Sequence, residues 1–189
     1  MLIRHAHTTL NVEGRVNGDP AVPVHLTDEG RAEAERVGHQ LAALSFGLCV
    51  HTRFMRTEET ADELLHGRDV PRLEEPLLDD IDVGDLEGAK LEEYRAWKRA
   101  HPRGEPFPGG ESLDDAARRY ARAFRRLLER PEDAILVVCH EIPVRYALNA
   151  AAGSPDLDAP ERLIPNATPY LFDAEALERA ATRIELLVN

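Results

Sequence analysis

Two histidines follow apolar runs that lie far apart in the chain. Arg4 and His5 come directly after Leu2 and Ile3, and His140 follows a longer apolar run at residues 134–139. Short apolar runs predict buried strands, and α/β proteins place their ligands at the carboxyl edge of such a sheet. The pattern therefore predicts that both histidines and Arg4 meet at one sheet edge.

These side chains suit phosphoryl transfer. A phosphate monoester carries up to two negative charges, so a nucleophile that approaches it needs cations nearby. Arg4 and a protonated His140 would provide that charge. His5 has a reference pKa of about 6.5 and is partly neutral at pH 7, so one ring nitrogen can attack while a hydrogen bond holds the other. The acidic stretch at residues 78–88 offers carboxyl groups that could protonate the leaving group.

In these motifs the chain resembles the histidine phosphatase superfamily, the phosphoglycerate mutase-like proteins. The resemblance runs in order over most of the sequence. It rests on six elements: Arg4-His5-Ala6, Leu26-Thr27-Asp28-Glu29-Gly30, residues 52–61, residues 80–88, Pro108-Gly109-Gly110-Glu111-Ser112, and residues 138–145. A single dipeptide would be weak support, but six elements in the family's order form a specific signature.

This resemblance implies a metal-independent phosphomonoesterase that uses no cofactor and acts on a small-molecule phosphate monoester. It makes His5 the nucleophile of a phosphohistidine intermediate and Asp80 the acid, which then serves as base toward water. Arg56, rather than Arg53, takes the place of the pocket arginine. The other implied phosphate-binding residues are Arg4, Thr8, Asn11 and His140, with Thr8 and Asn11 at the hydroxyl and amide positions.

Several positions depart from the family's pattern. Asp80 stands where many relatives have the longer glutamate, so Asp79 or Asp82 could serve as the acid instead. Crowding among these aspartates would raise the pKa of Asp80 toward a useful range. Ala6 replaces a glycine, which matters only if the backbone there needs a positive φ. His7 replaces a common glutamate and adds a potential positive charge.

Glu141 is a further departure, because it replaces the glycine after the second histidine. It places a carboxylate at a helix N-terminus beside the expected phosphate. One interpretation is a helix cap or an acid that faces solvent. The other is a substrate-binding residue that partners His140 or a cationic group on the substrate.

Composition limits the classes of protein and partner. The 189 residues are 43% hydrophobic, which suits one well-filled domain, and the formal net charge of −12 argues against nucleic acid or an anionic membrane surface as a partner. Cys49 and Cys139 lie in apolar runs and are expected to be reduced core thiols. We expect a cytoplasmic protein, since no signal peptide or membrane-length apolar run is visible. Only three residues precede Arg4, so the first strand is very short or the true start lies upstream.

The order of expected elements indicates the fold. Strands at residues 47–50 and 135–139 alternate with helices that begin near Thr27, Phe54 and Ser112. Thr27 is a good N-cap, and Ser112 and Asp115 resemble a capping box. The arginines of the helix after Ser112 are expected to be solvated. Residues 168–172 and 184–188 read as closing strands, the last one an edge that could mediate a homodimer.

This alternation predicts an α/β fold, a three-layer α/β/α sandwich with a mostly parallel central sheet. Residues 1–189 would form a single domain, in which the segment from Pro71 to Gly110 carries the acid and forms a lid-like cover over the site. A short helix is expected at residues 91–97, and the Pro- and Gly-rich stretch at 101–110 is expected at the rim. His25 and His51 could also reach the pocket rim.

Three other functions compete with hydrolysis. A mutase of the same family would have to retain the phosphoryl group and donate it again, and such mutases tend to have longer insertions where this chain is short, between Gly88 and Gly109. A non-catalytic protein that binds a phosphorylated ligand is the second, suggested by Ala6, Asp80 and Glu141. A metallohydrolase that uses His5 and His7 with aspartates is the third and least favoured. The identity of the phosphate monoester stays open.

Overall fold

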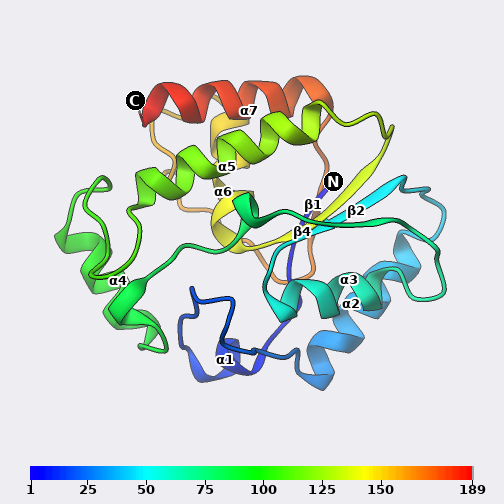
Figure 1. The fold of residues 1–189 in the computed structure, drawn as a ribbon, viewed down its shortest axis with the longest axis horizontal. Coiled ribbons are helices and arrows are strands. Elements are labelled where there is room, and N and C mark those ends of the chain that lie inside the picture. Colours follow the sequence, from blue (N-terminus) through cyan, green and yellow to red (C-terminus); the bar gives the residue numbers. More distant parts are fainter. Residues whose placement is uncertain (189) are drawn as a thin grey trace.

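A five-stranded sheet forms the centre of the protein, seen in a computed structural model that describes residues 1–188 (Figure 1). The strand order is β3-β2-β4-β1-β5. Four strands run parallel, and β5 lies antiparallel to β1 at one edge. The strands are β1 (Leu2–Arg4), β2 (Leu48–His51), β3 (Arg72–Glu74), β4 (Ile135–Cys139) and β5 (Pro169–Tyr170).

Helices cover both faces of this sheet, so the predicted three-layer α/β/α sandwich is confirmed (Figure 1). Helices α2 (Asp28–Gln40) and α3 (Met55–Leu64) pack on one face. Helices α5 (Leu113–Leu128), α6 (Glu141–Ala151) and α7 (Ala174–Leu187) pack on the other. Two smaller helices, α1 (Thr9–Glu13) and α4 (Leu91–Ala100), complete the α-helical elements, with short 3-10 turns at Pro76–Leu78 and Gly84–Leu86.

The apolar strands are buried on both faces because their side chains alternate between two cores. On β4, Leu136 and Val138 pack on the side of α2 and α3, whereas Val137 and Cys139 pack on the side of α5, α6 and α7. Side chains of successive strand residues point to opposite faces, so a central parallel strand must be apolar throughout. This accounts for the uninterrupted apolar run that the sequence shows before His140.

Two capping predictions are confirmed. The Thr27 hydroxyl accepts from the Gly30 amide at 3.0 Å at the start of α2. Ser112 and Asp115 form a reciprocal capping box at the start of α5, with 3.0 Å between the Asp115 amide and the Ser112 hydroxyl. These caps satisfy amide groups that the first helical turn leaves without partners.

The prediction of a closing strand at residues 184–188 is wrong, because this segment is the end of helix α7. Ala180, Ala181 and Ile184 are fully buried and recur at the three- and four-residue spacing of a helix. The edge strand that would have supported a homodimer contact is therefore not present there.

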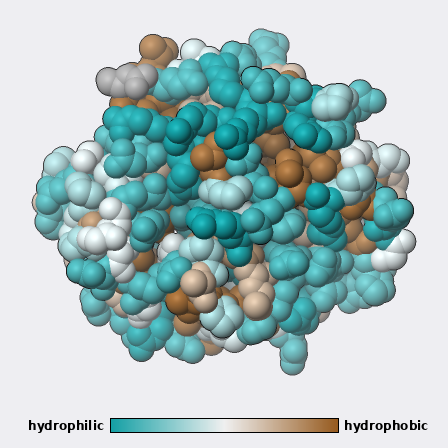
Figure 2. Space-filling view, viewed as in Figure 1, coloured by the Kyte–Doolittle hydropathy of each residue, from teal (hydrophilic) through white to brown (hydrophobic). Residues whose placement is uncertain are grey.

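The surface agrees with the acidic, polar composition. The face in Figure 2 is mostly hydrophilic, with apolar side chains showing in a few places near its centre. No helix among residues 1–188 is long and apolar enough to cross a membrane.

Candidate active site

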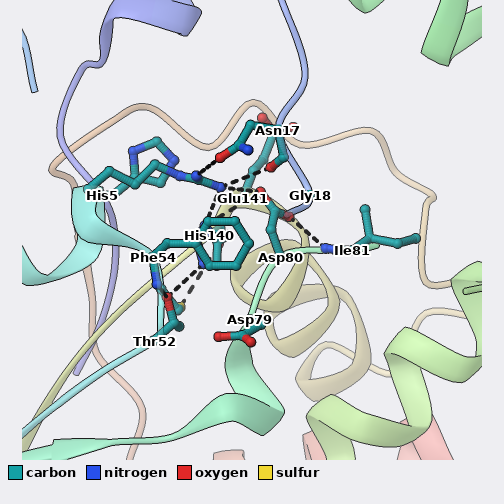
Figure 3. A network of polar contacts seen from close by, with 12 residues as sticks. His5, Asn17, Gly18, Thr52, Phe54, Asp79, Asp80, Ile81, His140 and Glu141 are labelled. Carbon is teal, nitrogen blue, oxygen red and sulfur yellow. Dashed lines mark hydrogen bonds and ion pairs between the residues drawn. The ribbon is translucent and has the colours of Figure 1, made fainter. Parts of the chain in front are cut away.

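The strand register brings the two histidines together. Arg4 pairs with Cys139 across β1 and β4, and the His5 amide donates to the Cys139 carbonyl at 2.9 Å. The His5 and His140 rings consequently lie edge to face, with 5.5 Å between their centroids (Figure 3). The meeting of both histidines at one sheet edge, which the two apolar runs predict, is confirmed.

A pocket of about 790 Å³ opens at this edge. Its walls come from the ends of β1 and α3, from helices α1, α4 and α6, and from residues 161–166. Seven of the eight residues implicated by the sequence line it: Arg4, His5, Thr8, Asn11, Arg56, Asp80 and Glu141. The eighth, His140, is fully buried behind Arg56.

His5 is held in one orientation and kept neutral. Its Nδ1 lies 2.8 Å from the Ala6 carbonyl, to which it can only donate, so Nε2 carries the lone pair. Burial, reinforced by the positive charges of Arg56 and Arg4, lowers the pKa of His5 well below its ordinary value. Ala6 has no positive φ, so its replacement of the family's glycine does not strain the backbone.

The surroundings of His140 disfavour the protonated side chain that the sequence predicts. Its Nε2 lies 3.0 Å from the Thr52 hydroxyl, and its Nδ1 lies 3.2 Å from a guanidinium nitrogen of Arg56. Arginine can only donate, so this contact uses Nδ1 as the acceptor, although the Asp80 carboxylate lies 3.4 Å from the same nitrogen. Burial and the charge of Arg56 lower the pKa of His140 well below its ordinary value. The positive charge of the centre therefore comes from arginines.

Arg56, and not Arg53, reaches the pocket. Arg56 is buried, with Nη2 at 3.1 Å from the Asp80 carboxylate and at 3.2 Å from the Asn17 carbonyl. Its Nη1 donates to the Asn17 side chain. Arg53 is instead half exposed and binds Asp79 at 2.5 Å.

Asp80 is the aspartate that faces the histidines. Its carboxylate lies 3.4 Å from Nδ1 of His140, and Figure 3 shows Asp79 turned away from this centre. Asp79 is committed to Arg53, and the exposed Asp82 accepts from the Gly84 amide at 2.9 Å. Burial raises the pKa of Asp80, with Arg56 opposing the rise, so desolvation rather than crowding by neighbouring aspartates is the cause.

Glu141 bridges two arginines at the mouth of the pocket. One carboxylate oxygen lies 3.1 Å from Arg4, and the other accepts from Arg145. Arg4 also donates to the Ile164 carbonyl at 2.7 Å. Glu141 is thus neither a simple helix cap nor a hydrogen-bond partner of His140, and it lies where it competes with an anion for Arg4.

Thr8 and Asn11 form the capping box of α1 beside His5. The Thr8 hydroxyl donates to Oδ1 of Asn11 at 3.0 Å and accepts from the Asn11 amide at 3.2 Å. Asn166 donates to the His5 carbonyl at 2.8 Å and to the same Oδ1 at 3.4 Å. These contacts leave the Asn11 side-chain NH₂ available to a ligand in the pocket.

Of three further histidines that the sequence places near the site, one lines the pocket and two do not. His7 lines it, whereas His25 pairs with Glu59 at 2.7 Å and His51 contacts the Thr52 carbonyl at 2.9 Å. His25 and His51, which could have reached the rim, do not line the pocket. Within residues 1–188, no three histidine, cysteine or acidic side chains are arranged to hold a metal ion, so His5 and His7 have no third ligand.

The segment 71–110 reaches the pocket mainly through α4 and through residues 80–83. The Pro- and Gly-rich stretch 101–110, expected at the rim, does not line it. Phe107 is buried instead and packs against Trp97, with ring centroids 4.1 Å apart. Helix α4 therefore forms the wall that this stretch was expected to provide.

Several residues of the centre carried no clear sequence signal. Asn17 holds Arg56, Thr52 holds His140, and Thr60 accepts from the Ala6 amide at 3.0 Å. The residue types of Asn17 and Gly18 are typical of a turn, but Gly18 is also needed for close packing. A Cβ at Gly18 would lie 2.2 Å from the Ile81 carbonyl, so only glycine lets this loop pack against the segment that carries Asp80.

We expect the stability of the protein to fall as the pH is lowered from 7.5 to 5.5. Both buried histidines have pKa values below that of the unfolded chain, so only unfolding takes up their protons in this window. At one pH unit below 6.5, each such histidine costs on the order of 1 kcal/mol. Urea unfolding of the native protein and of His140→Gln at both pH values checks this, since the variant should lose about half of the decline. A decline of equal size in both proteins would contradict this prediction.

Asp80 has the opposite effect on stability, because its raised pKa favours the folded state as the pH falls.

Replacing Glu141 with glycine should tighten the binding of vanadate or inorganic phosphate. The change removes the carboxylate that occupies Arg4, and the gain should shrink at high salt because the site is partly exposed. Glu141→Gln tests charge without adding backbone freedom, and calorimetric titration of both variants measures the anion affinity. An unaltered affinity in both variants would show that Glu141 has only a structural part.

Comparisons with known proteins agree with these features. The family model of the histidine phosphatase superfamily (branch 1) matches residues 1–185. A 2,3-bisphosphoglycerate-dependent phosphoglycerate mutase 2 of Gloeobacter violaceus is 31% identical over 163 residues, which cover 78% of this chain and 73% of that protein.

Solved structures with the same fold include phosphatases. The α-ribazole phosphatase of Shigella flexneri is 28% identical with a TM-score of 0.72, covering 82% of this chain and 79% of that one. YhfR of Bacillus stearothermophilus is 26% identical with a TM-score of 0.75, covering 88% and 85%.

Proposed function

Since the chain belongs to the histidine phosphatase superfamily, branch 1, we propose that it is a metal-independent phosphomonoesterase that acts on a small phosphorylated metabolite through a phosphohistidine. One observation supports this most strongly. His5 is buried and neutral, its Nδ1 is fixed by the Ala6 carbonyl, and two arginines stand beside it. A fixed, neutral imidazole beside cations suits nucleophilic attack on an anionic phosphate.

In the first step, Nε2 of His5 attacks phosphorus. The P–N bond forms while the bond to the leaving oxygen breaks, and Arg4 and Arg56 stabilise the charge on the phosphoryl oxygens. The Asn11 side-chain NH₂ adds a neutral hydrogen bond from the edge of the pocket, and the Thr8 hydroxyl adds a second if it turns away from Oδ1 of Asn11. His140 accepts from Arg56 and so fixes the direction of that guanidinium.

Asp80 supplies the proton for the leaving oxygen. Its raised pKa increases the protonated fraction, and protonation also frees Arg56 from its 3.1 Å contact with the carboxylate. In the second step the Asp80 carboxylate takes a proton from water. That water attacks phosphorus, the P–N bond breaks, and orthophosphate leaves with His5 restored.

A mutase reaction is the second candidate, because relatives named phosphoglycerate mutases match this chain. The same phosphohistidine would then be transferred to a hydroxyl group instead of water. The two reactions differ in product, since only the phosphatase releases one orthophosphate for each ester consumed. A protein that binds phosphorylated ligands without catalysis would show neither product.

A panel of phosphate monoesters, assayed with and without EDTA, tests the proposal. We expect orthophosphate release that survives chelation, because Arg4 and Arg56 stand where a metal enzyme would place its cations. Loss of turnover with EDTA that Zn²⁺ or Mn²⁺ restores would overturn the metal-independent mechanism. Isomerisation of 3-phosphoglycerate without orthophosphate release would favour the mutase.

A further inference from the structure

Residues 77–83, which carry Asp80 and which we call the acid segment, have little regular structure. A 3-10 turn ends at Leu78 and another begins at Gly84, and residues 79–83 lie in neither a helix nor a strand. A general acid must nevertheless stay within hydrogen-bond reach of the leaving oxygen. Contacts from other parts of the fold must therefore fix the place of Asp80.

Arg119 on α5 binds the acid segment with its whole guanidinium group. Its Nη1 donates to the carbonyl oxygens of Leu77 and Asp79, both at 2.9 Å. Its Nη2 donates to the Asp80 carbonyl at 3.2 Å and to Oε1 of Glu111 at 2.5 Å, and its Nε donates to Oε2 of Glu111 at 3.3 Å. These contacts employ all the N–H donors that a guanidinium has. The expectation that the arginines of α5 are solvated is therefore wrong for Arg119.

The orientation of Arg119 is fixed by a buried ring as well as by Glu111. Its guanidinium carbon lies 4.8 Å from the centroid of the Tyr120 ring, and Tyr120 is fully buried. Only 15% of the Arg119 side chain is exposed. A planar guanidinium can lie over a ring while its edges donate, which a lysine ammonium cannot reproduce. The fold thus sets the direction of Arg119, and Arg119 sets that of the acid segment.

The stretch at residues 108–112 supports the other end of the acid segment. The Glu111 amide donates to the Asp82 carbonyl at 3.0 Å, and Oε1 of Glu111 accepts from the Asp82 amide at 3.1 Å. A Cβ at Gly110 would lie 2.4 Å from the Asp82 carbonyl oxygen, so a larger residue would push the two segments apart. This glycine-rich stretch does not line the pocket of His5, but it contacts the segment that does.

We propose that Arg119 and Glu111 are positioning residues for Asp80. Neither lines the pocket of His5, and Arg119 contacts the backbone of the acid segment, Glu111 and the Tyr120 ring. Both residues therefore act through Asp80 and not on the substrate. This inference rests on the proposed function, because it assumes that Asp80 protonates the leaving oxygen. A displacement of about 1 Å in a reacting group can cost about a hundredfold in rate.

The dependence of the rate on the leaving group tests this role. Arg119→Lys keeps the charge but replaces a planar fork with donors at a single nitrogen. We expect it to lower kcat by about tenfold to a hundredfold for an alkyl phosphate that the native protein hydrolyses, with a smaller loss for p-nitrophenyl phosphate. In an Asp80→Asn background it should cause no further loss on the alkyl ester.

Glu111→Gln is a milder variant of the same contact. Glutamine can still accept from the Asp82 amide, but it has no charge to pair with Arg119. Its loss should again be larger for the alkyl ester, by about threefold to tenfold. Arg122→Lys is the matched control and should leave both rates unchanged, since Arg122 is exposed on the same helix outside the pocket. Thermal unfolding confirms that each variant is folded.

Two kinds of result separate this inference from the proposed function. Equal losses on both esters in Arg119→Lys and Glu111→Gln, or losses that multiply with that of Asp80→Asn, would overturn the positioning role alone. If Asp80→Asn itself slows both esters equally, the acid role of Asp80 is overturned, and the positioning role with it. If Arg119→Lys does not fold, Glu111→Gln decides by the same criteria.

A different set of contacts positions Arg56. Glu87 accepts from the Asn17 side-chain NH₂ at 2.7 Å, from the Gly18 amide at 2.6 Å and from the Asp19 amide at 3.0 Å. Because the NH₂ of Asn17 faces Glu87, its Oδ1 is free to accept from Arg56, as it does. Arg56 also donates to the Asn17 carbonyl at 3.2 Å.

The geometry points to Glu87 as a positioning residue for Arg56. A carboxylate can only accept, so Glu87 determines which end of the Asn17 amide faces the guanidinium. Glu87 does not line the pocket of His5 and acts through Asn17. This inference also rests on the proposed function, in which Arg56 binds the phosphoryl group both before and during the reaction. Loss of its position should therefore lower affinity and rate together.

Glu87→Gln should raise the Kd of vanadate by about tenfold and lower kcat/KM by a similar factor for alkyl and aryl esters alike. In an Asn17→Ala background it should cause no further change. Asp85→Asn is the matched control, because Asp85 is exposed, lies two residues away and does not line the pocket of His5.

Unchanged vanadate affinity in Glu87→Gln, or losses that multiply with those of Asn17→Ala, would overturn the positioning of Arg56 by Glu87. Weaker vanadate binding in Glu87→Gln, in a protein whose native form hydrolyses no ester, would overturn the phosphatase but not this positioning role.

Discussion

His5→Ala should lower kcat by about 10⁴-fold or more, because the variant has no nitrogen to form the P–N bond. The rest of the centre should persist, since among residues 1–188 the His5 side chain hydrogen-bonds only to the Ala6 carbonyl, at 2.8 Å. The measurement is steady-state turnover of p-nitrophenyl phosphate, with thermal unfolding to confirm the fold. Substrate affinity should change much less than kcat.

The matched control for this variant is His25→Ala. His25 pairs with Glu59 outside the pocket, so its loss should leave kcat within about twofold of the native value. A His5→Ala protein that is folded and turns over within tenfold of the native rate would exclude His5 as the nucleophile.

Asp80→Asn should lower kcat by about 10²- to 10⁴-fold for alkyl phosphates, the range of general acid catalysis. With an aryl phosphate the loss should be much smaller, since that leaving group departs without a proton. The acid must be protonated, so the native rate should fall as the pH rises through the raised pKa of Asp80, and this dependence should be absent from the variant.

Asp82→Asn is the control for position and charge, because Asp82 lies two residues away but is exposed and does not line the pocket of His5. Asp79→Asn tests the other rival, whose carboxylate is held by Arg53. Two results together would move the acid role to Asp79. Asp80→Asn would slow alkyl and aryl phosphates equally, and Asp79→Asn would slow alkyl phosphates more than aryl phosphates.

The sequence predicted the parts of the site that follow from local pattern. His5 and His140 end apolar runs, and parallel pairing in register suffices to bring such residues together. Arg56 lies in the first turn of α3, after the end of β2, so its place near the edge follows from the same topology. The Thr27 cap and the capping box of Ser112 and Asp115 are likewise local and were predictable from residue spacing.

Features that depend on tertiary contacts were not predictable in this way. The neutral state of His140 depends on Arg56, which lies 84 residues away in sequence, and on burial. In the sequence Arg119 cannot be told from the other arginines on the polar face of α5. Only its tertiary contact with the segment that carries Asp80 distinguishes it. The last residues of α7 have a strand-like composition, and only their packing against α5 and α6 makes them helical.

The most direct test of the central claim is rapid acid-free quenching of the native enzyme with ³²P-labelled substrate, followed by peptide mapping. The proposed mechanism predicts label on His5 that is stable to base and labile to acid, appearing before orthophosphate and absent from His5→Ala. Two results would contradict the phosphohistidine mechanism. One is orthophosphate release without an initial burst and without label on the protein, and the other is label on a residue other than His5.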